Sequence, residues 1–221
     1  MRAGHGVSAP RLRGEGRGEG AFPQSQNCRK PLSPGMHAAT LVALAIFACA
    51  PCAAQTIDEK AQLCAACHGG NGIPQQISTP AIWGQQLGYL YLQLRDYKSG
   101  ARKNDQMSAV ATTLERDDML ALALYVSQKP WPNLAQPRAS DAVAAQALRA
   151  SNAVVCTSCH HESYKGEGTQ PRLAGQRKEY LAQTMSDFRD GRRGNNPGMS
   201  DLMKSISADD ITALAEYLAG L

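Results

Sequence analysis

The chain repeats itself, and this repeat constrains the fold more than any other feature of the sequence. The segment CAACH at residues 64–68 recurs as CTSCH at residues 156–160, a shift of 92 positions. Further matches at a shift of 91 or 92 join Pro80 to Pro171, Gly84-Gln85 to Gly175-Gln176, Tyr89 to Tyr180, Arg102 to Arg193, Met107 to Met199 and Tyr125 to Tyr217. Because the match extends well beyond the cysteines, it predicts the duplication of a whole domain.

The apolar spacing within each copy predicts helices. Leucine and tyrosine recur at helical intervals over residues 86–98, and Gly100 follows them as a helix C-terminal cap. The last helix is expected to start at Ser207, because Ser207 and Asp210 form a Ser-x-x-Asp capping signal before an apolar stripe. The sequence shows no alternating strand pattern of useful length. We therefore expect an all-α protein.

A proline-rich segment separates the two copies. The stretch PWPNLAQPRAS at residues 130–140 holds three prolines, which stiffen a chain and cannot continue a helix. We expect a linker at residues 131–139 between one domain at residues 55–130 and a second at residues 140–221. Domains of about 80 residues are stabilised only marginally by an apolar core alone.

The N-terminal part of the chain is expected to lie outside these domains. Residues 1–35 are rich in glycine, arginine and proline, which indicates a disordered extension or a start codon assigned too early, with Met36 as the true start. Residues 36–54 have the short apolar run and small-residue end of a signal peptide, so we expect cleavage after Ala54. A faint lipoprotein-like site keeps lipid anchoring through Cys49 as an alternative.

The positive charge of the chain does not indicate nucleic-acid binding. The formal net charge of +4 comes wholly from the segment before the first domain, and the rest of the chain has as many acidic as basic residues. Nucleic-acid binding requires a concentrated basic face. We therefore expect no nucleic-acid partner.

Cleavage of the signal peptide would leave four cysteines, in two C-x-x-C pairs that are each followed by a histidine. These residues are Cys64, Cys67 and His68 in the first copy, and Cys156, Cys159 and His160 in the second. Zinc sites usually bring two such pairs within about 20 residues, and a redox dithiol needs a βαβ setting. Haem c uses both cysteines for thioether bonds and the histidine to bind iron. Two matched copies favour two covalently bound haem c groups, with zinc and dithiol chemistry as the alternatives.

The second axial ligand of each iron is expected to be a methionine. Met107 follows its histidine by 39 residues, and Met199 follows its own by 39. Both lie in polar segments that we interpret as loops, where a core methionine would be unusual. We assign the remaining methionines of the two domains to the core, because their partners in the repeat are not methionine; they are Met119, Met185 and Met203.

Two further pairs of residues are expected near the haems. Pro80 and Pro171 follow the histidines by 12 and 11 residues, so their carbonyl groups could accept the second imidazole N–H, with an ordinary loop proline as the alternative. Arg102 and Arg193 could pair with haem propionates, with a solvated arginine as the alternative.

The chain resembles class I cytochrome c twice over, and closely resembles the di-haem cytochrome c4 family. The resemblance covers residues 57–221 and is carried by CAACHGGNG, P-A-I-W-G-Q and Met107 in the first copy, and by CTSCHH, P-R-L-A-G-Q and N-P-G-M in the second. It implies two haem domains related by pseudo-two-fold symmetry, a periplasmic location, and electron delivery from a quinol-oxidising complex or dehydrogenase to a terminal oxidase.

One residue departs from the family pattern. The family usually has glycine after the haem histidine, as at Gly69, whereas the second copy has His161. Because neighbours on a helix point about 100° apart, we expect His161 not to share the iron with His160, but to be a titrating group beside the second haem.

The resemblance favours an electron carrier over an enzyme. Two irons with both axial positions filled have no open site for substrate. Three alternatives remain. The first is a di-haem electron-accepting subunit of a periplasmic dehydrogenase complex. The second is a di-haem peroxidase, which needs an iron that can open a coordination site, so the paired methionines and the short chain argue against it; the third is a sensor, for which an output domain is missing. Association with the membrane surface is expected only through redox partners.

Overall fold

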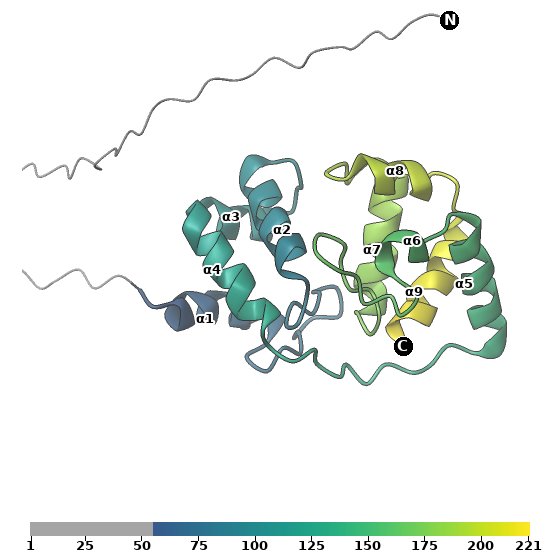
Figure 1. Ribbon diagram of the computed structural model, residues 1–221, viewed down its shortest axis with the longest axis horizontal. Coiled ribbons are helices and arrows are strands. Elements are labelled where there is room, and N and C mark those ends of the chain that lie inside the picture. Colours follow the sequence, from purple (N-terminus) through teal and green to yellow (C-terminus); the bar gives the residue numbers. More distant parts are fainter. Residues whose placement is uncertain (1–54) are drawn as a thin grey trace, which may run out of the picture. The chain divides into compact units, whose positions relative to one another are not determined.

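The structure is a computed structural model that describes residues 55–221 (Figure 1). The predicted N-terminal extension, the signal peptide and the alternative anchor at Cys49 lie outside these residues. The described part of the chain contains helices and no strands, which confirms the all-α prediction. Its helices are α1 (Ile57–His68), α2 (Leu87–Ser99), α3 (Asp105–Thr112), α4 (Arg116–Ser127), α5 (Asp141–Ala153), α6 (Thr157–His160), α7 (Lys178–Arg189), α8 (Pro197–Met203) and α9 (Ala208–Ala219).

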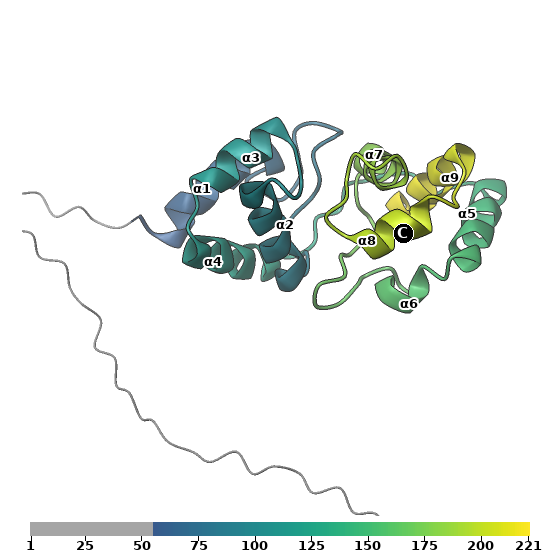
Figure 2. The ribbon, with the colours of Figure 1, turned by 90° about the horizontal axis from the view of Figure 1, so that it is seen from above.

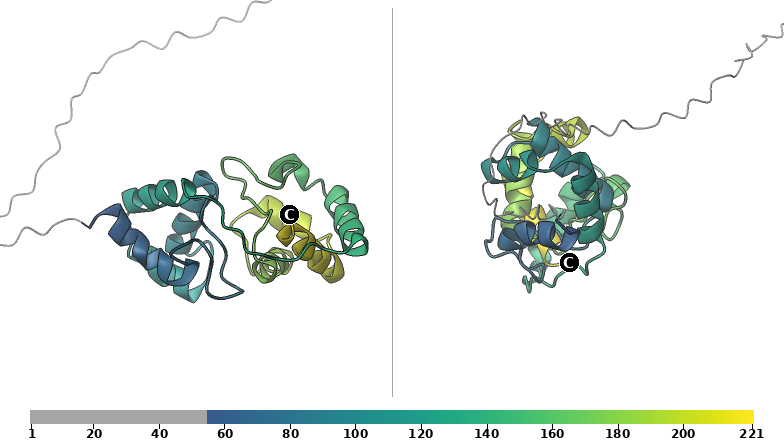
Figure 3. Two further views of the ribbon diagram at one scale, coloured as in Figure 1. Left: turned by 90° about the horizontal axis from the view of Figure 1, so that it is seen from below. Right: turned by 90° about the vertical axis from the view of Figure 1, so that its left-hand side faces the viewer.

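The helices of each repeat pack on one another around a separate apolar cluster. In the first repeat, α4 packs against α1 and α2, and α2 also contacts α3 (Figure 2). The second repeat is built around α9, which packs against α5 and α7, while α8 contacts α7 (Figure 3). The cluster of the first repeat is small and consists of Ala61, Leu114, Met119 and Leu122, whereas that of the second is larger. Two tandem cytochrome-like domains are therefore formed, although their predicted boundaries stay a prediction.

Local capping explains where several helices begin. Thr56 and Glu59 form a capping box at the start of α1, since each side chain accepts a hydrogen bond from the other residue's backbone N–H. Ser207 Oγ accepts from Asp210 N at 3.1 Å, which confirms the predicted start of α9. Gly100 ends α2 in the left-handed conformation, also as predicted.

The two copies differ in the helix that carries the C-x-x-C-H motif. In the first copy α1 runs without interruption through the motif to His68. In the second copy α5 ends at Ala153, and only the single turn of α6 precedes the end of the motif at His160. Val155 separates the two helices with a φ of +54°, a conformation that a helix does not contain. The shared motif therefore lies on different local structures.

The proline-rich segment between the copies is extended and fixed against the second copy. The Gln136 side chain donates to the carbonyl of Gln176 at 2.8 Å and accepts from the N–H of Lys178 at 2.9 Å. Arg172 lies over the ring of Trp131 at 4.6 Å.

In residues 55–221, none of the helices combines the length and the apolar character needed to cross a lipid bilayer.

Candidate functional site

A buried histidine ends the motif helix in each copy. The His68 side chain is buried, and its Nδ1 lies 2.8 Å from the carbonyl oxygen of Pro80. His160 is also buried, with Nδ1 3.0 Å from the carbonyl oxygen of Pro171. Because a carbonyl only accepts, Nδ1 must carry the proton, and Nε2 keeps its lone pair for a metal.

Both imidazoles are held in the neutral form. Burial lowers the pKa of His68, and the hydrogen bond to Pro80 opposes that shift without reversing it. Burial also lowers the pKa of His160, with the Pro171 bond acting against it and the neighbouring His161 acting with it. A neutral imidazole with a fixed tautomer is the form that binds iron.

None of the four described cysteines forms a disulfide bond. Cys64 and Cys67 lie on α1, while Cys156 precedes α6 and Cys159 lies within it. Burial raises the pKa of the Cys64 thiol. Residues 55–221 bring no three His, Cys, Asp or Glu side chains together as a metal-ligand set.

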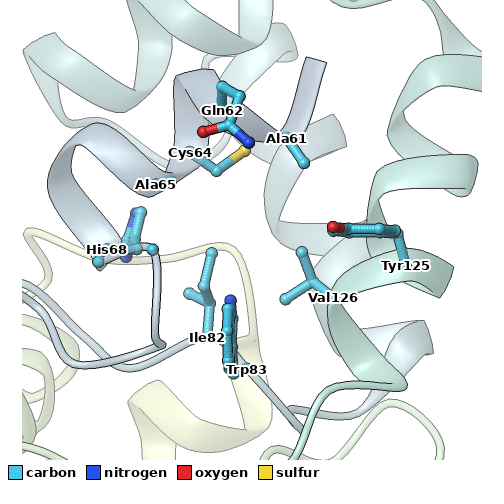
Figure 4. A pocket seen from close by; sticks show the side chains of 11 residues that line it. Ala61, Gln62, Cys64, Ala65, His68, Ile82, Trp83, Tyr125 and Val126 are labelled. Atoms are coloured by element: carbon cyan, nitrogen blue, oxygen red, sulfur yellow. The ribbon is translucent and has the colours of Figure 1, made fainter. Parts of the chain in front are cut away.

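A small pocket of roughly 80 Å³ lies beside the first motif (Figure 4). Cys64 and His68 line one side, and Trp83 and Tyr125 contribute aromatic walls. A cysteine and an imidazole on the wall of one pocket are the residue types that hold a covalently attached macrocycle. The sequence interpretation missed Trp83 as a lining residue, although the P-A-I-W-G-Q segment contains it.

The two methionines predicted as ligands do not lie in loops. Met107 is the third residue of α3, and its N–H donates to Asn104 Oδ1 at 3.0 Å. Met199 has the same place in α8, where its N–H donates to Asn196 Oδ1 at 3.1 Å. The loop interpretation was wrong because each asparagine acts as an N-cap and starts a helix before the methionine.

The methionines assigned to the core are buried, as predicted. Their exposed fractions are 4% for Met119, 9% for Met185 and 3% for Met203. Met107 and Met199 are only partly buried, and Met107 is not among the residues that line the cavity of Figure 4. The partial burial distinguishes the two ligand candidates from the core methionines.

The two predicted propionate arginines are buried between the copies. Arg102 donates to the hydroxyl of Tyr180 at 3.1 Å, and Arg193 donates to the hydroxyl of Tyr89 at 3.4 Å. Both guanidinium groups also donate to Gln93 Oε1 at 2.8 Å. Each arginine thus contacts the tyrosine of the other copy, and their burial argues against the solvated alternative.

These arginines control the acidity of the tyrosines. Burial by itself would raise the pKa of Tyr180, but the positive charges of Arg102 and Arg193 and the hydrogen bonds at its hydroxyl lower it to about 7. Burial raises the pKa of Tyr89, with the nearby Tyr180 adding to the increase. Besides the two guanidinium groups, the buried Asp96 carboxylate also lies between the copies, where it accepts from Asn195 Nδ2 at 2.7 Å.

A pair of glutamines joins the copies reciprocally. Gln85 Nε2 donates to the carbonyl of Arg172 at 3.0 Å, and Gln85 Oε1 accepts from the N–H of Arg172 at 2.7 Å. Gln176 makes the same two contacts to Ala81, at 2.9 and 2.8 Å. Because these positions are equivalent in the repeat, the contacts agree with a pseudo-two-fold relation between the domains.

His161 lies beyond the helix that carries His160. It caps α6 with a φ of +60°, and its side chain is 52% exposed, with Nε2 3.6 Å from Glu167 Oε2. The reasoning that placed both histidines on one helix was therefore wrong, since α6 ends at His160. The expected role of His161 as a titrating group stays a prediction.

Comparison with known proteins supports the family assignment. Residues 142–221 match the family model for cytochrome c. The chain is 36% identical to cytochrome c4 of Pseudomonas aeruginosa over 73% of this chain and 85% of the relative, and 34% identical to the thiosulfate dehydrogenase electron acceptor of Stutzerimonas stutzeri over 73% and 80%. The structure of reduced recombinant cytochrome c4 from Pseudomonas stutzeri matches with a TM-score of 0.67 and 30% identity, over 75% of this chain and 96% of that one.

The duplicated motif, the two buried histidines and these relatives lead to one conclusion. Two cysteines that form no disulfide and a neutral imidazole in each copy are the groups that covalent haem attachment requires. The chain belongs to the cytochrome c4 family and is a di-haem electron-transfer protein with two covalently bound haem c groups.

Proposed function

We propose that this protein is a periplasmic one-electron carrier whose two haems are held by equivalent residues of the two domains. In the first domain Cys64 and Cys67 form the thioether bonds, and His68 and Met107 bind the iron. The observation that carries this proposal is the buried imidazole of His68, whose Nδ1–H is fixed by the Pro80 carbonyl. It leaves Nε2 as the only free ring nitrogen.

The second domain uses the equivalent set. Cys156 and Cys159 attach the haem, and His160 and Met199 bind its iron, with Pro171 fixing the imidazole. Haem supplies reversible one-electron chemistry, and a thioether ligand opposite histidine favours reduced iron. Arg102 and Arg193 are placed to neutralise propionates between the domains, because both are buried there and donate hydrogen bonds to amide and hydroxyl oxygens instead of carboxylates.

The donor is proposed to be a quinol-oxidising complex or a dehydrogenase, and the acceptor a terminal oxidase. Similarity to a protein named as a thiosulfate dehydrogenase electron acceptor supports a dehydrogenase as donor. The same similarity keeps the second candidate, a subunit that stays bound to such a dehydrogenase. The signal-peptide pattern before residue 55 supports export to the periplasm.

The test has two parts. The exported protein should gain the mass of two haems and lose its N-terminal segment, and its reduced spectrum should be six-coordinate and low-spin. Stopped-flow mixing with a purified quinol-oxidising complex and with a purified thiosulfate dehydrogenase should then identify the donor. A free carrier is reduced in repeated turnovers and elutes alone, whereas a subunit co-elutes with the dehydrogenase. A high-spin spectrum with both methionines intact would contradict the carrier.

A further inference from the structure

The peptide group that binds each histidine also binds a glutamine of the other domain. The Pro80 carbonyl accepts from His68 Nδ1 at 2.8 Å, and the N–H of the same peptide unit, on Ala81, donates to Gln176 Oε1 at 2.8 Å. The relation is repeated in the second domain. There the Pro171 carbonyl accepts from His160 at 3.0 Å, and the N–H of Arg172 donates to Gln85 Oε1 at 2.7 Å.

The orientation of each glutamine is fixed. Its Nε2 donates to the carbonyl of the same residue whose N–H it accepts, so Gln176 contacts both backbone groups of Ala81. The exposed fractions are 3% for Gln176, 4% for Gln85 and 1% for Ala81. A flipped amide would place two donors or two acceptors against each other. The glutamine oxygen is therefore held on the peptide N–H.

Turn geometry brings each glutamine across the domain boundary. Gly84 and Gly175, directly before the glutamines, have φ values of +68° and +74°, which favour glycine. The N–H of Gly84 donates to the Val126 carbonyl at 3.0 Å, and that of Gly175 donates to the Leu218 carbonyl at 2.8 Å. Each turn is thus fixed to the last helix of its own domain.

Hydrogen bonds in series polarise one another, most strongly where water is excluded. An acceptor on the Ala81 N–H increases the negative charge on the Pro80 oxygen, which then draws the His68 Nδ1 proton more strongly. The imidazole becomes a stronger electron donor, and this stabilises oxidised iron. The same reasoning applies to Gln85, Pro171 and His160.

We propose that the two glutamines tune the haems crosswise: Gln176 of the second domain lowers the potential of the haem on His68, and Gln85 of the first domain lowers that of the haem on His160. Each glutamine is a positioning residue, since it acts through the peptide and the histidine. The proposal rests on the proposed histidine ligation. Communication between the domains then passes through three hydrogen bonds on each side of the pseudo-two-fold axis.

The test uses the haem-loaded protein and the variants Gln176→Leu and Gln85→Leu. The two potentials are measured by redox titration followed by NMR, in which the haem signals are assigned to their domains. We expect Gln176→Leu to raise the potential of the haem on His68 and leave the other unchanged, and Gln85→Leu to do the reverse. A shift of the haem in the mutated domain, equal shifts of both haems, or no shift would overturn the proposal.

A control separates this effect from general loosening of the interface. Gln86 Nε2 also crosses between the domains, to the carbonyls of Lys165 and Gly166 at 3.0 and 3.2 Å, but it touches neither histidine-binding peptide. Gln86→Leu should leave both potentials unchanged. If it reproduces the shifts of Gln176→Leu, then the cause is the interface and the proposal is wrong.

A conservative variant and a second readout complete the test. Gln176→Glu, as a buried neutral carboxylic acid, keeps an acceptor for the Ala81 N–H and a donor for the Ala81 carbonyl, so the potential of the haem on His68 should stay close to that of the wild type. Amide hydrogen exchange should accelerate at Ala81 in Gln176→Leu and stay unchanged in Gln176→Glu; any other pattern opposes the mechanism. If NMR spectra of the wild-type protein lack the signals of histidines bound to iron, the proposed function itself is contradicted.

Discussion

His161 and Gly69 directly follow the motif histidines at equivalent positions of the repeat and share a similar, unusual backbone conformation. Gly69 has φ and ψ of +84° and 134°, and His161 has +60° and 163°. Side-chain-bearing residues rarely adopt this region, at a cost on the order of 1–3 kcal/mol. The loop from the motif histidine to the following proline is one residue shorter in the second copy. A side chain directly after the histidine therefore has different neighbours in the two domains.

Replacing His161 with glycine should therefore stabilise the protein. We expect His161→Gly to raise the free energy of unfolding by about 1 kcal/mol, because glycine adopts this conformation without strain. Chemical denaturation of the haem-loaded protein measures the change. His161→Ala keeps the strain and should give no such gain, so stabilisation by alanine would show that the imidazole, not the backbone, is responsible.

The reverse change in the first copy should be strongly destabilising. A Cβ on Gly69 would clash with the backbone oxygen of Ile73, which cannot move away as a side chain can. Gly69→Ala should lower the unfolding free energy by roughly 2 kcal/mol or more through strain and this contact. Unchanged stability in thermal unfolding would mean that the loop at Ile73 is adaptable.

The methionine variants test the axial ligands one at a time. If Met107 and Met199 bind the two irons, the near-infrared band of methionine–iron bonding in the oxidised protein should lose one contribution in Met107→Ala and the other in Met199→Ala. The potential of the affected haem should fall, because the thioether favours reduced iron. Met119→Leu, a change in the buried core, is the matched control and should leave the band intact.

The contact between the first turn of α2 and the second domain should tolerate no side chain. Gly88 is the second residue of α2, and a Cβ there would lie 2.7 Å from the Gly168 carbonyl oxygen. Gly198 is the second residue of α8, where a Cβ would meet only a side-chain atom at 3.5 Å. We expect Gly88→Ala to lower the unfolding free energy by about 1–2 kcal/mol and Gly198→Ala to be neutral or stabilising. If both substitutions change the unfolding free energy equally, then the two domains are not in tight contact at Gly88.

The acidity of Tyr180 tests whether the buried arginines pair with propionates. The guanidinium groups of Arg102 and Arg193 lower the pKa of Tyr180 to about 7, against about 10 in an unfolded chain. A group whose pKa is lowered by folding gives stability that grows as pH rises from 7 to 10. Propionates on the guanidinium groups would offset their charge and return the pKa toward 10, which would remove this pH dependence.

We therefore expect Tyr180 in the haem-loaded protein to stay protonated through pH 9, with stability nearly constant between pH 7 and 9. The ¹³Cζ shift of selectively labelled tyrosine follows the proton, and Tyr180→Phe identifies the signal. Titration of Tyr180 near pH 7 would show that the arginines remain paired with tyrosine, and the predicted propionate contacts would then be wrong.

The sequence by itself determined the features that depend on neighbouring residues or on repetition. The C-x-x-C-H motifs and their spacing indicated two haems, and the capping signals located the start of α9 and the end of α2. The spacing of Pro80 and Pro171 from the histidines predicted the two carbonyl contacts that the structure forms. These signals are readable because caps, helical periodicity and motifs act over a few residues, and the repeat supplied an internal comparison.

Tertiary structure decided what joins residues far apart in the chain. The exchange of glutamines brings Gln85 to Arg172 across 87 positions, and no local pattern specifies such a pair. The interruption of the second motif helix at Val155 was also missed, since a positive φ at a non-glycine residue depends on the packing around it. The capping of α3 by Asn104 was missed although it is a local signal that the sequence carries. The sequence therefore determined the haem chemistry, and only the tertiary structure placed each haem histidine in contact, through one peptide group, with the opposite domain.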